Sequence, residues 1–339
     1  MECIKKPDNV WVWIEQENGT AKDVGFELLA PACSIARSAF GQAVAVMVGE
    51  KIPEGMIRQA ASYGADVAII VEDAIYGQYR TESFTRVFCT LAEKYKPDSI
   101  LFGATDNGRD LAPRVAARLK TGLTADCTDL RAGTEGVIEF ICPAFGGNFM
   151  VTITCPDHRP QMGTVRPGVF QKYGVHPHPL KVIRENIGFP QEEIRTVILE
   201  STGKNGREES KLEDAQIVVA GGRGMGGPEP FKLLEELAEE LGGMVASSRP
   251  PVDLGWTTHK RMVGQTGKNI KPKLYIACGI SGAAQHLSAV ACAERLIAIN
   301  RDRKAPIFHA ADYGIVGDVM EVIPALLREL RTIKGKGNI

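Results

Sequence analysis

The sequence predicts an α/β protein in which a parallel-sheet domain with a small β-hairpin element is followed by a doubly wound domain of five parallel strands. Apolar runs alternate with segments of helical spacing in both halves of the chain, a pattern typical of βαβ units. The 36 glycines suit the tight turns of such units, and 339 residues with 44% hydrophobic content suffice for two cores.

Four apolar runs in the N-terminal half predict strands of a parallel sheet, at residues 10–15, 43–49, 65–71 and 99–104. Residues 83–95 have helical spacing. From about residue 136 two apolar runs, "GVIEFICPAF" and "NFMVTITCP", flank a Gly-Gly pair with no helix between them, which indicates a hairpin. Residues 194–200, "IRTVILE", predict one further strand.

A polar run, "STGKNGREESKLED", separates the two halves. We therefore expect an N-terminal domain over residues 1–201, a linker over 202–212 and a C-terminal domain over 213–339. Five strands are expected in the C-terminal domain, within residues 215–222, 244–248, 273–279, 296–300 and 306–312. Helices are expected at 229–241, after residue 282 and towards residue 331.

Composition excludes several classes of function. Forty basic and 41 acidic residues give a formal net charge of -1, so no global charge favours nucleic acid or an anionic membrane. No apolar run approaches the roughly 20 residues of a membrane span, and the first residues lack a signal-peptide pattern. The eight cysteines are scattered without a CxxC pair, which indicates reduced thiols and no iron–sulfur or zinc site.

In open parallel sheets, ligands bind beyond the carboxyl ends of the strands. The segments that follow the expected C-terminal strands are rich in glycine and polar residues. We expect a ligand site formed by residues 221–227, 247–249, 279–286, 300 and 312–314.

The segment "GGRGMGG" has the GxGxxG spacing at Gly222, Gly224 and Gly227 that lets a backbone approach a pyrophosphate. The acid that NAD sites carry about 20 residues later is replaced by Ser248 and Arg249, a pair better suited to phosphate. An NADP-dependent dehydrogenase is therefore one alternative. Glycines that serve only close helix–sheet packing are another.

Two further segments suit a cofactor. "VGQTGK" is too short for a P-loop, but Gln265 and Thr266 can hydrogen-bond the edge of a heteroaromatic ring; a polar surface turn is the alternative. In "GISGAAQH", Ser281 and Gly282 offer backbone N–H groups before a helix, and His286 can stabilise negative charge on a reduced cofactor. A purely structural histidine is the competing interpretation.

Taken together, "VVAGGRGMGGPEPFKLLEELAEELGG", "ASSRPPVDLGW", "VGQTGKNIKPKLYIACGISGAAQHL", "AINRDRKAPIFHAADYGIVGD" and "IPALL" resemble the electron-transfer flavoprotein alpha subunit over about residues 215–331. "GATDNGRDLAPRVAARLKTGLTADCTDL" resembles the family's N-terminal segment. The resemblance implies a Rossmann-like domain with one FAD, a heterodimer with a beta subunit that the N-terminal domain contacts, and electron transfer through a flavin semiquinone. We also expect a cytoplasmic protein of an anaerobic bacterium.

The resemblance further implies a set of cofactor contacts and no nucleophile or general acid. Arg223 would lie near the isoalloxazine, Gln265 and Thr266 at its N5 and O4 edge, and His286 at N1 or O2. The pyrophosphate would meet residues 281–285, and the adenosine half would meet Asn300 and Asp318. The complete set is Arg223, Gly224, Ser248, Arg249, Val263, Gly264, Gln265, Thr266, Gly279, Ser281, Gly282, Ala283, Ala284, Gln285, His286, Asn300 and Asp318.

Within the family, the sequence leaves two kinds of member as alternatives. A simple shuttle passes electrons to an acyl-CoA dehydrogenase or related reductase, and its beta subunit holds AMP. A bifurcating member takes electrons from NADH to ferredoxin and an acyl-CoA dehydrogenase, and its beta subunit holds a second FAD. Arg166, in "GTVRPG", resembles the arginine that bifurcating members direct at that second flavin, although a surface salt bridge is an equal alternative. A non-catalytic nucleotide-binding or assembly subunit is the remaining class.

Overall fold

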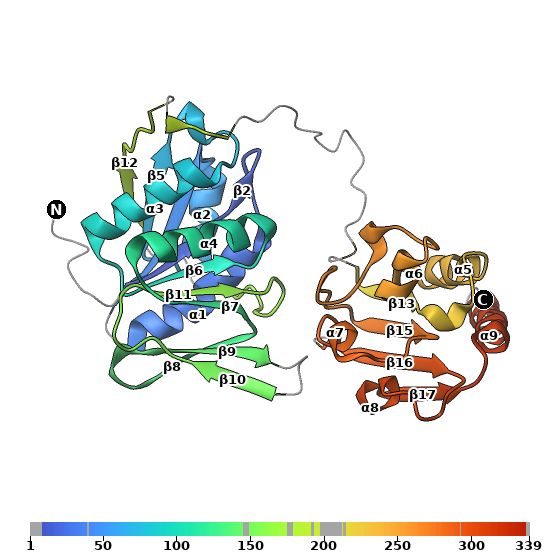
Figure 1. Ribbon diagram of the computed structural model, residues 1–339. Helices are drawn as coiled ribbons and strands as arrows, with labels where there is room; N and C mark the ends of the chain where they lie inside the picture. The colour runs from blue at the N-terminus through green and yellow to red at the C-terminus, as the bar shows by residue number, and fades with distance from the viewer. Residues whose placement is uncertain are drawn as a thin grey trace. The chain divides into compact units, whose positions relative to one another are not determined.

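The computed structural model describes residues 9–38, 41–144, 149–174, 179–190, 193–196, 212, 215–291 and 293–336. The chain divides into two compact units, residues 1–142 with 150–201 and residues 143–149 with 202–339. Each unit is a layered arrangement of helices on a sheet (Figure 1). The expected linker lies outside the described residues except for Leu212. None of the helices in the described ranges is long and apolar enough to cross a membrane.

A seven-stranded sheet forms the centre of the first unit, with strand order β12-β5-β4-β1-β6-β11-β7 and parallel pairing throughout. Successive residues of β1 face opposite sides: Val10 and Val12 pack with α1 and α2, whereas Trp11 and Trp13 pack with α3 and α4. The strands and helices are β1 (Val10–Trp13), β4 (Ala43–Gly49), β5 (Val67–Glu72), β6 (Ser99–Gly103), β7 (Leu123–Cys127), β11 (Gln161–Val165), β12 (Lys181–Glu185), α1 (Asp23–Ser38), α2 (Glu54–Ser62), α3 (Thr81–Tyr95) and α4 (Asp106–Leu119).

The hairpin predicted near residue 136 is present as β9 (Ile138–Ala144) and β10 (Phe149–Ile153), which with β8 (Asp129–Ala132) form a three-stranded sheet of order β10-β9-β8. Phe140 of β9 packs in the same core as α1, so this sheet covers the α1 side of the unit. The remaining short elements are β2 (Gln16–Glu17), β3 (Thr20–Ala21), η1 (Ala74–Tyr76) and η2 (Thr134–Gly136).

One sequence-based expectation in this unit was wrong. Residues 194–196 of the strand expected at 194–200 are not in a strand, and residues 197–200 lie outside the described part. The additional edge strand is β12, whose Lys181, Arg184 and Glu185 interrupt any apolar run. The first three residues of the "GTVRPG" segment end the buried strand β11, and Arg166 follows them.

The first unit has its topological switch point between β1 and β6, where doubly wound sheets bind ligands. Glu15, which follows β1 and is 2% exposed, occupies this place. Its carboxylate accepts hydrogen bonds from Thr105 Oγ1 at 2.5 Å, Asn107 Nδ2 at 2.8 Å and Lys22 Nζ at 2.6 Å. Thr105 also caps α4 by accepting from Gly108 N at 3.0 Å. The buried Glu15 carboxylate is therefore satisfied at the switch point by donors from its own chain.

The second unit has a five-stranded parallel sheet of order β14-β13-β15-β16-β17, so its switch point lies between β13 and β15. Helices α5 and α9 pack on one face of this sheet, and residues of α7 and α8 pack on the other. The elements are β13 (Ile217–Gly221), β14 (Met244–Ser247), β15 (Leu274–Cys278), β16 (Arg295–Asn300), β17 (Tyr313–Val316), α5 (Phe231–Leu241), α6 (Arg249–Asp253), α7 (Ala284–Leu287), α8 (Ile307–Ala310), α9 (Val319–Lys336), η6 (Arg223–Met225) and η7 (His259–Arg261).

Five parallel strands are confirmed, but the fifth is not the segment expected at residues 306–312. Residues 307–310 form α8, with Pro306 at its N-cap, and the strand β17 begins only at Tyr313. Proline lacks a backbone N–H and has a φ suited to a helix start, which explains the difference. Residues 312–314 therefore lie at the amino end of a strand rather than beyond a carboxyl end.

Candidate functional site

Predicted site residues follow the carboxyl ends of all five C-terminal strands. Arg223 follows β13, Ser248 follows β14, Ser281 follows β15, Asn300 ends β16, and Asp318 follows β17. Because neighbouring parallel strands end at the same edge, the structure brings these residues to one rim.

The loops after β13 and β15 are packed backbone to backbone at the switch point. Gly222 N donates to Cys278 O at 2.8 Å, and Gly224 N donates to Gly279 O at 2.9 Å. A Cβ at Gly222 would lie 2.3 Å from the Gly279 oxygen, and one at Gly224 would lie 2.7 Å from it. A Cβ at Gly227 would meet nothing closer than 3.9 Å. Close packing thus accounts for two of the three glycines in the GxGxxG spacing, although their partner is a loop and not a helix.

The turn at residues 263–268 is tied to the end of β14 and to α7. Val263 N donates to Ser247 O at 2.9 Å, and Gln265 N donates to Gln285 O at 2.8 Å. Gln265 and Thr266 are exposed. Their side chains are therefore available beside the residues that follow β14 and β15, as a ligand-edge role requires.

Exposed and buried residues alternate along the rim. The buried predicted residues are Ser248, Val263, Gly282, His286 and Asn300. The exposed ones are Arg223, Gly224, Arg249, Gln265, Thr266, Ser281, Ala283, Gln285 and Asp318, while Gly264, Gly279 and Ala284 are partly buried.

Two arginines give the rim positive charge. Arg249 Nε lies 3.2 Å from Asp253 Oδ2 in a pair whose side chains are 67% and 59% exposed, an arrangement worth well under about 1 kcal/mol. Arg223 forms no ion pair with any residue that the structure describes. Both guanidinium groups can therefore turn to an anionic ligand with little loss, and this donor set suits a dinucleotide cofactor.

Asn300 and Asp318 already have structural partners. Asn300 Nδ2 donates to Ile280 O at 2.9 Å, and its Oδ1 accepts from Asp302 N at 2.9 Å. Asp318 Oδ1 accepts from Met320 N at 2.8 Å at the start of α9. Asn300 thus links the loops after β15 and β16, and an adenosine contact from either residue stays a prediction.

His286 is buried, and both ring nitrogens have protein partners. Nδ1 lies 3.0 Å from Val263 O, and Nε2 lies 2.8 Å from the hydroxyl of Tyr275. Burial lowers the pKa of His286, and the Val263 contact opposes that shift only in part. α7 has only four residues, so it supplies little of the helix dipole expected beside Ser281 and Gly282.

Tyr275 was not among the residues expected at the site, whereas Ser247 lies within the expected segment 247–249. Tyr275 lies within the apolar run of β15, and a phenol inside such a run was the available signal that its hydroxyl needs a partner. Ser247 Oγ is buried at the end of β14 without a hydrogen-bond partner among the described atoms. Arg166 lies in the first unit, directly after β11. Its backbone N–H donates to Cys127 O at 3.0 Å.

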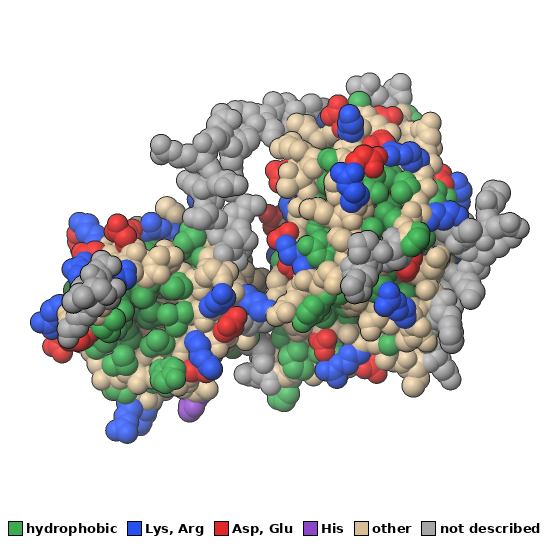
Figure 2. All heavy atoms as spheres, turned by 180° about the vertical axis from the view of Figure 1, so that it is seen from behind, with side chains coloured by type: hydrophobic (Ala, Val, Ile, Leu, Met, Phe, Trp, Pro, Cys, Tyr) green, Lys and Arg blue, Asp and Glu red, His purple; other side chains and the backbone are tan. Residues whose placement is uncertain are grey.

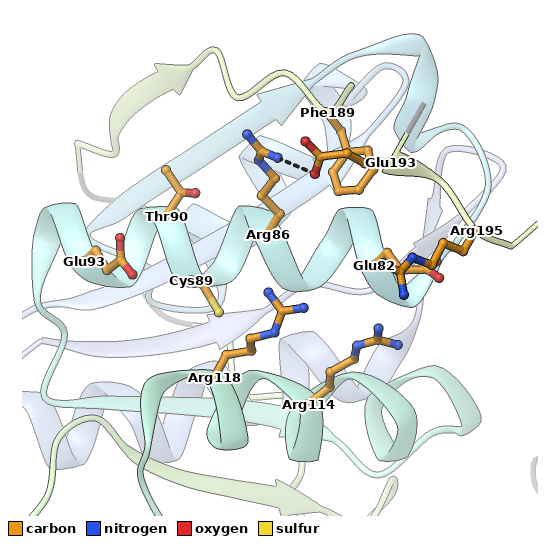
Figure 3. A pocket seen from close by; sticks show the side chains of 10 residues that line it. All are labelled: Glu82, Arg86, Cys89, Thr90, Glu93, Arg114, Arg118, Phe189, Glu193 and Arg195. Atoms are coloured by element: carbon orange, nitrogen blue, oxygen red, sulfur yellow. Dashed lines mark hydrogen bonds and ion pairs between the residues drawn. The ribbon is translucent and has the colours of Figure 1, made fainter. Parts of the chain in front are cut away.

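The first unit contains a separate cavity of about 620 Å³ between α3 and α4. Figure 3 shows Arg114 and Arg118 of α4 pointing towards α3, while Arg86 pairs with Glu193 at 3.0 Å. Glu82 and Glu93 offset the arginines in the lining. On the face shown in Figure 2, acidic and basic side chains are likewise interspersed, so no basic surface for nucleic acid is visible there.

Comparison with known proteins assigns both units. Residues 10–195 match the family described as "Electron transfer flavoprotein domain", and residues 211–291 match "Electron transfer flavoprotein FAD-binding domain". The chain is 47% identical over 327 residues to "Electron transfer flavoprotein subunit alpha" of Thermoanaerobacterium thermosaccharolyticum, covering 96% of this chain and 98% of the relative.

Two further relatives are similar over nearly their whole length. "Protein FixB" of Clostridium saccharobutylicum is 46% identical, covering 96% of each chain. "Acryloyl-CoA reductase electron transfer subunit beta" of Anaerotignum propionicum is 36% identical, covering 95% of each chain.

Proposed function

This chain belongs to the electron transfer flavoprotein alpha-subunit family, and from that premise we propose that its C-terminal unit binds one FAD along the rim of the five-stranded sheet. Bound there, the flavin would accept and release the electrons that the protein passes between a dehydrogenase and its acceptor. The observation that carries the proposal is that Arg223, Arg249 and the loop at residues 279–286 follow three neighbouring parallel strands, β13, β14 and β15, around the switch point of the sheet.

The residues of this chain would bind and orient the cofactor. Arg223 and Arg249 supply positive charge, which favours an electron-rich ring by direct electrostatics. Gln265 and Thr266 offer groups that both donate and accept hydrogen bonds, so they can serve a ring edge in either redox state. The NADP-dependent dehydrogenase alternative loses support, because Gly222 and Gly224 already serve the packing of the β15 loop.

The test is co-expression of the full chain with its beta-type subunit, followed by a visible spectrum and a count of bound flavin. A yellow complex that bleaches on reduction is expected, and it should lose flavin when Arg223 and Arg249 are both replaced by glutamine. A colourless complex would contradict the proposal. Replacing Arg328, an exposed arginine of α9, is the matched control and should leave the flavin in place.

We further propose a heterodimer with a beta subunit, placed in the bacterial cytoplasm, with an acyl-CoA dehydrogenase or related reductase as electron partner. The name of the Anaerotignum propionicum relative, an electron transfer subunit of an acryloyl-CoA reductase, supports that partner class. The proposal predicts that the purified heterodimer reoxidises a reduced acyl-CoA dehydrogenase. Failure across several such enzymes would count against it.

Bifurcation from NADH to ferredoxin is the second candidate, and the same relative's name favours considering it. It requires a second FAD in the beta subunit, whereas a shuttle would hold AMP there. Arg166 would then serve the second flavin from the end of β11. Two flavins per heterodimer, one of them lost in Arg166→Gln, would support bifurcation. One FAD with one AMP would exclude it.

A further inference from the structure

The cavity between α3 and α4 has arginines from three separate segments in its lining. Arg114 and Arg118 belong to α4, Arg86 belongs to α3, and Arg195 lies in the segment that follows β12. The same lining holds three glutamates, so the four arginines leave a formal excess of one positive charge. The cavity volume of about 620 Å³ falls in the range of small-molecule sites. All lining residues belong to the first unit, so the cavity is not part of the candidate flavin rim.

The glutamates of the lining do not neutralise the arginines of α4. Glu193 Oε2 accepts a hydrogen bond from Arg86 Nη1 at 3.0 Å, and Glu82 Oε1 accepts one from Thr196 Oγ1 at 2.9 Å. Glu93, the third, is exposed. None of the three forms an ion pair with Arg114 or Arg118, all five residues being in the described part of the chain.

Arg114 and Arg118 are four residues apart on α4, so their side chains lie one above the other on the same face of the helix. Figure 3 shows both guanidinium groups extending from α4 towards α3. Neither forms an ion pair with any residue that the structure describes. Like charges at this spacing repel each other, and an anion bound by both would remove that repulsion.

The lining also contains neutral groups. Cys89 of α3 points towards α4 beside Arg118 (Figure 3), and burial raises the pKa of its thiol to about 11, so the thiol stays protonated at neutral pH. The guanidinium of Arg86 lies over the Phe189 ring, 5.5 Å from its centroid. The cavity thus combines a cationic wall on α4 with a small uncharged surface that could hold the rest of a ligand.

We propose that this cavity binds a small molecule with two anionic groups, which Arg114 and Arg118 hold. Each guanidinium can bind one phosphate or carboxylate group through two parallel hydrogen bonds. The two arginines are separated by about one turn of helix, roughly 5.4 Å along the axis, so both anionic groups must belong to a compact ligand. A diphosphate and a four-carbon dicarboxylate both meet this requirement. The inference does not depend on flavin binding by the second unit.

Isothermal titration calorimetry of the co-expressed complex tests the site, with inorganic pyrophosphate and succinate as the two probes. Tighter binding of pyrophosphate assigns the site to phosphate ligands, and tighter binding of succinate assigns it to carboxylates. Arg114→Gln and Arg118→Gln should each weaken binding about tenfold, because each removes a charge-assisted hydrogen-bond donor. Both variants should fold, since neither side chain has an ion-pair partner to lose among the described residues.

Arg58→Gln is the matched control. Arg58 is an exposed arginine of α2, and α2 packs on the other face of the seven-stranded sheet. This variant should bind the probe as the parent does. An equal loss of binding in Arg58→Gln would show a response to overall charge and would overturn the proposal.

Cys89 gives a local measure of occupancy. At pH 9 the bound probe should slow alkylation of Cys89 by iodoacetamide, whereas Cys155, which is also partly exposed but lies outside the lining, should react at an unchanged rate. The proposal is overturned if neither probe binds at millimolar concentration, or if the double variant of Arg114 and Arg118 keeps the parent affinity. Unslowed alkylation of Cys89 in a complex that binds the probe would likewise overturn it.

Discussion

Replacing Gly222 by alanine separates two interpretations of the glycine-rich loop. The φ of Gly222 is -108°, which alanine adopts freely, so strain would come only from contact. The new Cβ would lie 2.3 Å from Gly279 O and 2.7 Å from Ile280 Cα. Since ordinary contact begins near 3.4 Å, the two loops would have to separate by about 1 Å, at a cost typical of overpacking, roughly 1–3 kcal/mol.

Gly227→Ala in the same loop is the matched control. Its Cβ would meet Pro230 Cδ at 3.9 Å and nothing nearer, and its φ lies outside the positive range. The unfolded chain loses entropy on this change, so the effect should lie between zero and about 1 kcal/mol of stabilisation. Urea unfolding of the full complex measures the change in stability, and flavin retention on gel filtration measures cofactor binding.

The interpretation from packing predicts that Gly222→Ala destabilises the second unit and releases flavin, while Gly227→Ala does neither. If all three glycines instead cradled a pyrophosphate, Gly227→Ala would lose flavin as readily as Gly222→Ala. Equal losses in the two variants would therefore refute the packing argument.

Three other predictions follow from the same contacts. Arg223→Ala should lower the one-electron flavin potential by on the order of 1 kcal/mol, about 40 mV, because an exposed positive charge is lost; redox titration against Arg328→Ala measures this, and equal potentials would remove Arg223 from the site. Glu15→Ala should destabilise the first unit by about 1–3 kcal/mol in denaturant unfolding, since its buried donors lose their acceptor, whereas the exposed Glu17→Ala should change little. Because burial lowers the pKa of His286, the native chain binds fewer protons than the unfolded one, so stability should fall as pH drops below about 6.5; His286→Gln should flatten that slope, and an unchanged slope would contradict the lowered pKa.

Elements with strong local signals were predictable from sequence. Residues 43–49 are buried throughout and form an unbroken apolar run, which is typical of a central strand in a parallel sheet. The edge strand β12 is mostly exposed and reads as polar, so only its pairing with β5 defines it. The mistake at residues 306–312 has the opposite cause: an apolar segment reads as a strand, while Pro306 starts a helix.

The candidate rim was predictable because parallel strands place their ends together. What sequence could not supply were contacts between distant residues. His286 and Tyr275 are 11 residues apart, and the bond from His286 to Val263 spans 23. Neither spacing belongs to a periodic pattern. The sequence therefore marks His286 as a candidate site residue but does not reveal the hydrogen bonds of its ring. Glu15 likewise depends on Asn107, which lies 92 residues away.

The buried Glu15 has a consequence for how the protein responds to cofactor supply. The donors to Glu15 come from its own chain, so the folding of the first unit should not depend on the FAD proposed for the C-terminal unit. Mass action can stabilise only the unit that binds. In a cell short of flavin, newly made chains would then have a folded N-terminal unit that is able to assemble. Only the C-terminal unit would lack the stabilisation that its ligand supplies.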